Sequence, residues 1–63
     1  MKIEVELIKE TRKRQFYTVR ANDYLVCTHI WDKELADLIA AAVKEHAAEH
    51  GEAVWMEVMR DRN

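Results

Sequence analysis

The sequence has no proline and no serine, and it contains a single glycine and a single cysteine among 63 residues. Without serine there is no serine nucleophile, and one glycine cannot build a glycine-rich phosphate-binding loop. Cys27 has no second cysteine to pair with, so an internal disulfide is excluded and a reducing, cytoplasmic location is expected. With so few breaking residues, most of the chain is expected to be regular secondary structure joined by short polar turns.

Long hydrophobic runs are also missing, so no membrane-spanning segment is predicted. Charged and apolar residues alternate at the N-terminus, unlike in a signal peptide. Residues 1–63 are expected to form one small domain with a limited core. Residues 1–31 carry six basic and four acidic side chains (net +2), and residues 32–63 carry four and eight (net −4), which together give the overall −2.

Three segments predict β-strands. Residues 2–9 alternate apolar and charged side chains, and residues 15–21 and 24–31 are rich in aromatic and β-branched residues. Asn22 and Asp23 favour a two-residue turn between the last two segments. That turn predicts three opposed pairs: Ala21 with Tyr24, Val19 with Val26, and Tyr17 with Thr28.

A helix is predicted from Asp32, a good N-cap, to His50, with Gly51 as the residue that ends it. Residues 53–60 alternate again and predict a fourth strand. The expected fold is therefore α+β in the order β-β-β-α-β, one mainly antiparallel sheet with a single helix packed on one face. The helix is expected to pack on the sheet through Leu35, Leu38, Ile39, Ala42, Val43 and Ala47.

One helix covers only one face of a sheet, so the other face is expected to carry an open apolar patch. A longer hairpin turn, which would exchange the faces of the second and third strands, is the alternative. The patch predicts a non-enzymatic protein-interaction module that forms a homodimer or binds another protein, as many small phage and mobile-element accessory proteins and inhibitors do. The predicted partner-binding residues are Ile8, Phe16, Arg20, Leu25, Cys27, Trp55 and Met59.

A basic turn offers a second function, nucleic-acid binding, in which cations contact phosphates and sheet aromatics stack on bases. The residues for this alternative are Lys9, Arg12, Lys13, Arg14 and Arg20. The order of elements resembles integrase arm-binding and plant AP2-type domains, whose three-stranded sheets backed by one helix read DNA, and the resemblance implies a sheet that contacts DNA. Because Glu4, Glu6 and Glu57 would repel phosphate from the same face, the sequence favours a solvated turn.

His46 to His50 reads H-x-x-E-H, the spacing of the inverted zinc-peptidase motif. That chemistry needs a third protein ligand and a substrate cleft, and only 13 residues follow. Two histidines at the negative end of a helix dipole are the favoured interpretation. Cys27, two residues before His29, is interpreted as a small apolar filler. No metal ligand, cofactor or catalytic residue is predicted.

Overall fold

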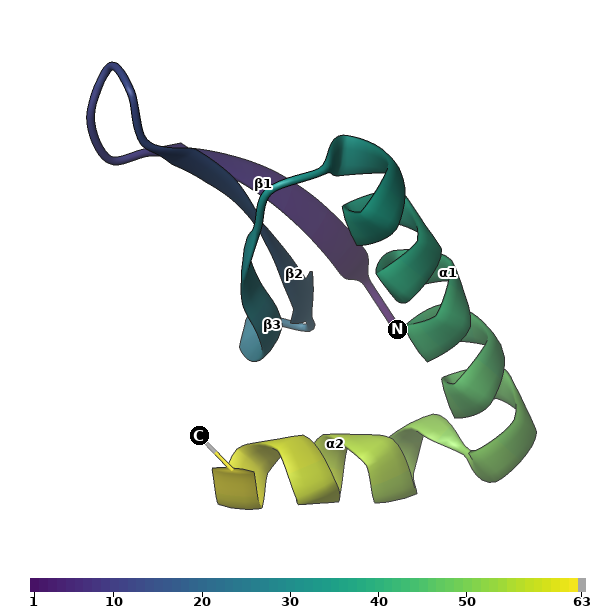
Figure 1. Ribbon diagram of the computed structural model, residues 1–63. Coiled ribbons are helices and arrows are strands. Elements are labelled where there is room, and N and C mark those ends of the chain that lie inside the picture. Colours follow the sequence, from purple (N-terminus) through teal and green to yellow (C-terminus); the bar gives the residue numbers. More distant parts are fainter. Residues whose placement is uncertain (63) are drawn as a thin grey trace.

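The computed structural model describes the backbone of residues 1–62 and the side chains of residues 1–57 and 60. A three-stranded antiparallel sheet in the order β1-β2-β3 is covered on one face by a long helix, and a shorter helix crosses below the sheet (Figure 1). The α+β class is therefore confirmed. The elements in chain order are β1 (Ile3–Lys9), β2 (Gln15–Ala21), β3 (Tyr24–Ile30), α1 (Lys33–His50) and α2 (Glu52–Arg62).

The first two strands pair along their full length without interruption. Val5 lies opposite Val19 on the face that α1 covers, which we call the inner face. The β1–β2 turn is tightened by Thr11, whose Oγ1 accepts hydrogen bonds from the amides of Arg14 at 2.9 Å and Lys13 at 3.3 Å. This turn projects as a free loop beyond the rest of the molecule, so its side chains are accessible (Figure 1).

The β2–β3 connection is the expected two-residue turn. Asn22 and Asp23 have φ angles of 48° and 73°, the left-handed region that a hairpin turn of this length requires. The first predicted pair, Ala21 opposite Tyr24, is present. The turn was therefore predictable from two residues that tolerate positive φ.

Beyond the turn, the predicted register is wrong because the β2–β3 pairing is irregular in two places. Val19 lies opposite Cys27 instead of Val26, and Tyr17 lies opposite Ile30 instead of Thr28. The second irregularity coincides with His29, whose φ of 58° is unusual for a side chain in a strand. Each extra residue in β3 reverses the faces of the residues that follow it.

The first irregularity, between Leu25 and Cys27, moves two side chains to the face opposite the predicted one. Cys27 packs against the buried cluster of the inner face. Thr28 lies on the other, outer face, where its hydroxyl is 2.8 Å from that of Thr18. Cys27 is therefore a small apolar filler, as interpreted from the sequence, but it lies on the inner face and not on the predicted outer one.

Helix α1 begins and ends where the sequence predicted. Asp32 Oδ1 accepts a hydrogen bond of 3.0 Å from the Glu34 amide, and Gly51, at φ 91°, donates its amide to the Ala47 carbonyl at 2.8 Å. The helix buries a face lined by Ala36, Val43 and Ala47 against the sheet. The core cluster consists of Val19, Ile30 and Ala36, with Ile39 partly buried beside it.

The predicted packing face of α1 is only partly right. Val43 and Ala47 are buried and Ile39 is half-buried, as expected, but Leu35 and Leu38 are 49% and 67% exposed, and Ala42 is exposed as well. The sheet is contacted instead by the alanine-rich side of the helix, which lets α1 approach the strands closely. Two leucines are thus left on the surface beside the buried stripe.

The predicted fourth strand is wrong, because residues 53–60 belong to helix α2. Alanine, methionine, glutamate and arginine in this segment are good helix formers, so its composition fits a helix as well as its alternation fits a strand. Trp55 donates its indole N–H to His46 of α1, and the Asn22 amide of the β2–β3 turn donates to the sulfur of Met56. These contacts join α2 to α1 and to the end of the sheet.

Candidate functional site

The residues predicted to bind a partner do not come together in the structure. Cys27 lies on the inner face, Trp55 lies on α2 against α1, and the Met59 side chain lies outside the described residues. The remaining four lie on the outer face of the sheet: Ile8, Phe16, Arg20 and Leu25. Trp55, the largest side chain of the predicted patch, is therefore not part of the outer face of the sheet.

The outer face is largely closed by its own side chains. Phe16 is only 7% exposed, because the His29 ring stacks on it at a centroid distance of 4.1 Å and Trp31 meets it edge-on at 5.9 Å. Thr18, which is 4% exposed, is hydrogen-bonded to Thr28 in the middle of the face. This side of the described sheet consequently offers little apolar surface to a partner.

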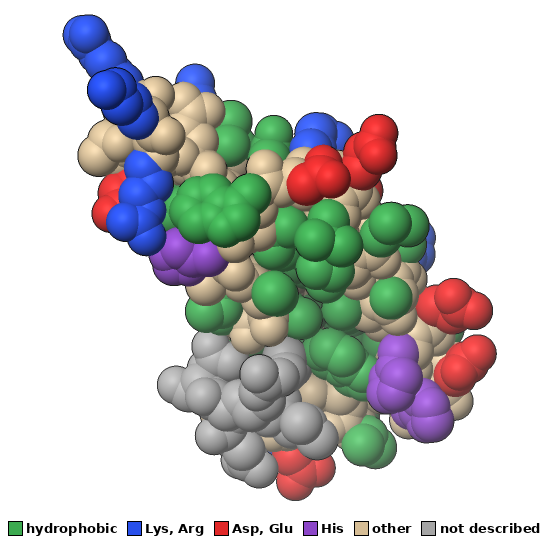
Figure 2. Space-filling model, viewed as in Figure 1, with side chains coloured by type: hydrophobic (Ala, Val, Ile, Leu, Met, Phe, Trp, Pro, Cys, Tyr) green, Lys and Arg blue, Asp and Glu red, His purple; other side chains and the backbone are tan. Residues whose placement is uncertain are grey.

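Exposed apolar side chains gather instead at the start of α1. Trp31, Leu35 and Leu38 are 62%, 49% and 67% exposed, and they lie within eight residues of the chain. Figure 2 shows hydrophobic side chains collected on this face of the molecule, over α1 and the neighbouring strand. Leu35, Leu38 and Ala42 follow one another at spacings of three and four, which places them on one side of the helix. We call these three residues the α1 surface.

Carboxylates border the α1 surface. Glu34 precedes Leu38 by one helical turn, and Glu45 and Glu49 continue the same side of the helix towards its C-terminus. All three glutamates are exposed, and none forms an ion pair with another described residue. Their charge is therefore available to a basic partner.

Asp37 is different, because it already has a partner. Its carboxylate is 2.9 Å from the Lys33 ammonium, one turn earlier on the helix. The hydrogen bond and the negative charge of Asp37 raise the pKa of Lys33, which keeps that cation protonated. A shallow hollow of about 350 Å³ lies beside this pair, lined by Glu34, Asp37 and Leu38. The acidic rim of the α1 surface thus encloses a depression at Leu38.

A second exposed site lies at the base of the β1–β2 turn. The Arg14 guanidinium lies 6.0 Å from the centre of the Trp31 ring, and its charge is shared with Glu10 at 3.5 Å. His29 contacts the same indole edge-on at 6.2 Å. We call the cations and rings gathered here the basic–aromatic site, which comprises Lys9, Arg12, Lys13, Arg14, His29 and Trp31.

The sequence missed Trp31 and His29 as members of this site. Trp31 was predicted only as the last residue of the third strand, and His29 only as a neighbour of Cys27. The positive φ of His29 turns its ring onto Phe16 beside Trp31. No sequence pattern predicts a bulge at a histidine. Aromatic residues next to a basic turn are the one available signal, because they are typical of nucleic-acid contacts.

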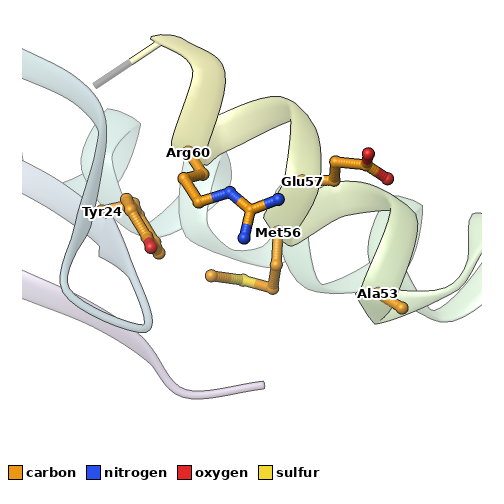
Figure 3. Close-up of a pocket in the computed structure, with 5 residues that line it drawn as sticks. All are labelled: Tyr24, Ala53, Met56, Glu57 and Arg60. Carbon is orange, nitrogen blue, oxygen red and sulfur yellow. The ribbon is translucent and has the colours of Figure 1, made fainter.

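Another hollow, of about 380 Å³, separates the β2–β3 turn from α2. Figure 3 shows Tyr24 on the sheet side facing Met56 and Arg60 across it. The cavity is wide open, and the charged groups that line it are one cation and one carboxylate, both exposed. The lining residues are Tyr24, Ala53, Met56, Glu57 and Arg60.

The two helices meet at a histidine pair. The His46 Nδ1 accepts a hydrogen bond of 2.7 Å from Trp55 Nε1, and the His46 and His50 rings stack at 4.2 Å. Among the described residues, no group of three or more His, Cys, Asp or Glu side chains is arranged to hold a metal ion. His46 instead acts as a hydrogen-bond acceptor that anchors α2.

Comparison of the chain with protein-family models, with curated proteins and with solved structures gives no match. In the part of the chain that the structure describes, neither helix has the length and apolar character needed to cross a bilayer. Inferences about function therefore come from the α1 surface and the basic–aromatic site themselves.

Proposed function

We propose that this chain is a non-enzymatic protein-interaction module that binds a basic, amphipathic segment of another protein along the α1 surface. The site differs from the open sheet face expected from the sequence. We therefore propose the same class of function, protein binding, but at a site on helix α1 and not on the sheet. The lone, partly buried Cys27 supports a cytoplasmic setting, in which such a thiol stays reduced.

The observation that carries the proposal is the exposure of Leu35 and Leu38 on a helix that has a buried apolar side next to them. Fully burying a leucine side chain is worth about 1.5–3 kcal/mol, and neither leucine gains this within the chain. A partner that covers both side chains recovers that free energy. Apolar helix faces of this kind are typical docking sites for a second helix.

Charge defines the chemistry of the partner. Glu34 lies beside the leucines, Glu45 and Glu49 follow on the same side of the helix, and none of the three pairs with another described residue, so lysine or arginine side chains flanking an apolar stripe complement them. From Leu35 to Glu49, the α1 surface and the carboxylates that follow it span about 21 Å along the helix axis at 1.5 Å per residue. A partner helix of about four turns matches that length.

A model peptide tests the proposal directly. A labelled helical peptide with leucines on one face and lysines on the other is titrated with the protein, and binding is followed by fluorescence anisotropy. A leucine–glutamate peptide of equal length is titrated in the same way for comparison. We expect the basic peptide to bind at least tenfold more tightly, because its charge matches the rim. Leu35→Ser with Leu38→Ser should abolish binding while leaving the net charge unchanged.

Val54→Ser is the matched control, since Val54 is 60% exposed but lies on α2. The control should bind the basic peptide as tightly as the original chain does. Equal affinity for both peptides, or binding that survives loss of both leucines, would contradict the proposal. A solution mass of two chains that reverts to one in the leucine double variant would identify a second copy as the occupant and overturn the basic-partner assignment.

A further inference from the structure

The basic–aromatic site combines charge and an exposed ring on one projecting hairpin. Residues 9–14 hold four cations and one carboxylate, a net charge of +3. That carboxylate, Glu10, is paired with Arg14. Lys9, Arg12 and Lys13 are exposed, and their side chains form no ion pair with another described residue. Figure 2 shows the basic side chains clustered at this end of the molecule.

The aromatic part of the site packs on the outer face of the sheet. Trp31 meets Phe16 edge-on, and Phe16 is almost fully buried. His29 stacks on Phe16 because its left-handed backbone directs the ring to the outer face. The Trp31 indole nevertheless stays 62% exposed. A large ring that contacts the sheet along one edge and is otherwise open to solvent offers a platform for stacking.

From this arrangement we infer that the hairpin binds single-stranded nucleic acid, with an unpaired base stacked on Trp31 and the backbone phosphates paired with Arg12, Lys13 and Arg14. A nucleotide carries its phosphate and its base side by side, as the site carries the Arg14 cation and the Trp31 ring. Double-stranded DNA keeps its bases stacked internally and cannot use the indole in this way. The site is separate from the α1 surface and independent of the proposed function.

The experiment uses fluorescein-labelled dT12, a 12-base-pair duplex and a heparin fragment of similar charge as probes. At 150 mM salt we expect a dissociation constant on the order of 10 μM or tighter for dT12, with affinity falling as salt rises. Trp31→Ala should weaken dT12 binding about tenfold, whereas Trp31→Phe keeps a stacking ring and most of the affinity. The duplex and heparin should bind more weakly and should not respond to Trp31→Ala.

Two triple variants with the same change in charge provide the matched control. Arg12→Ala, Lys13→Ala and Arg14→Ala should reduce dT12 binding at least a hundredfold, while Lys2→Ala, Lys33→Ala and Lys44→Ala should change it less than threefold. Circular dichroism confirms that each variant is folded. Equal losses in the two triples, or dT12 binding unaffected by Trp31→Ala, would show nonspecific polyanion attraction and overturn the inference. The leucine double variant should bind dT12 normally, which separates this result from the outcome for the α1 surface.

Discussion

At the scale of single residues, the fold depends on a small core centred on Val19. This side chain is fully buried and packs with Ile30 and Ala36 between the sheet and α1. Most of its neighbours are alanines or half-buried residues, so the core contains few large side chains. A small core of this kind supplies little reserve of stability, and the loss of one buried side chain is expected to be severe.

Val19→Ala should lower the free energy of unfolding by about 2–3 kcal/mol, because two methyl groups are lost and a cavity remains. Leu38→Ala should change it by less than about 0.5 kcal/mol, since that side chain is largely in solvent. Urea denaturation of both variants measures the two values. A larger loss for Leu38→Ala than for Val19→Ala would contradict the assignment of the buried face.

The residues of the second hairpin show where sequence reasoning succeeds and where it stops. Asn22 and Asp23 predict the turn between β2 and β3, because few residue pairs tolerate positive φ so readily. The bulge at His29 has no comparable signal, since a histidine in a strand ordinarily adopts extended backbone angles. The other irregularity, between Leu25 and Cys27, has no sequence signal either, and it moves Cys27 and Thr28 to the opposite faces and so changes the predicted interface.

At the scale of elements, the ends of α1 were predictable and its buried side was not. Asp32 and Gly51 mark the ends by chemistry that acts locally. Apolar residues, however, occupy more than one side of this helix, so periodicity alone does not select the side that meets the sheet. Alanines at Ala36 and Ala47 permit the closer approach, and the leucines remain outside.

Helix α2 shows a different limit of prediction from sequence. A segment of eight residues that alternates apolar and polar side chains matches a strand, yet its composition also suits a helix. Local pattern cannot decide between them when both fit. The deciding interactions are tertiary: Trp55 with His46, and the N-terminal amine of Met1 with the Glu52 carboxylate.

The contact between the helices depends on one hydrogen-bond acceptor. Trp55 donates to the His46 Nδ1, so that nitrogen carries no proton in the intact contact. Removing the acceptor should therefore weaken the attachment of α2 to α1.

The indole N–H resonance of Trp55 in nuclear magnetic resonance spectra reports this contact. It should move in His46→Ala and stay closer to its original position in His46→Gln, whose amide oxygen can accept the bond. His46→Ala should also cost about 1 kcal/mol of stability. An indole resonance that is unchanged in His46→Ala would contradict the contact.

At the scale of the whole molecule, charge is divided between two elements. The β1–β2 turn is basic, whereas the exposed side of α1 is acidic, as the unequal charges of the two sequence halves indicated. Screening over about 8 Å at physiological salt confines each field to its own surface. The molecule therefore presents two surfaces of opposite charge, and we propose that they bind different partners and can be inactivated separately.

The most direct test of the central claim is a map of backbone amide shifts when isotope-labelled protein is titrated with the leucine–lysine peptide. The account predicts the largest shifts at Leu35, Leu38 and Ala42 and at the bordering glutamates, with the β1–β2 turn unchanged. Large shifts confined to the outer face of the sheet, at Ile8, Arg20 and Leu25, would contradict the claim and restore the sheet face as the interface.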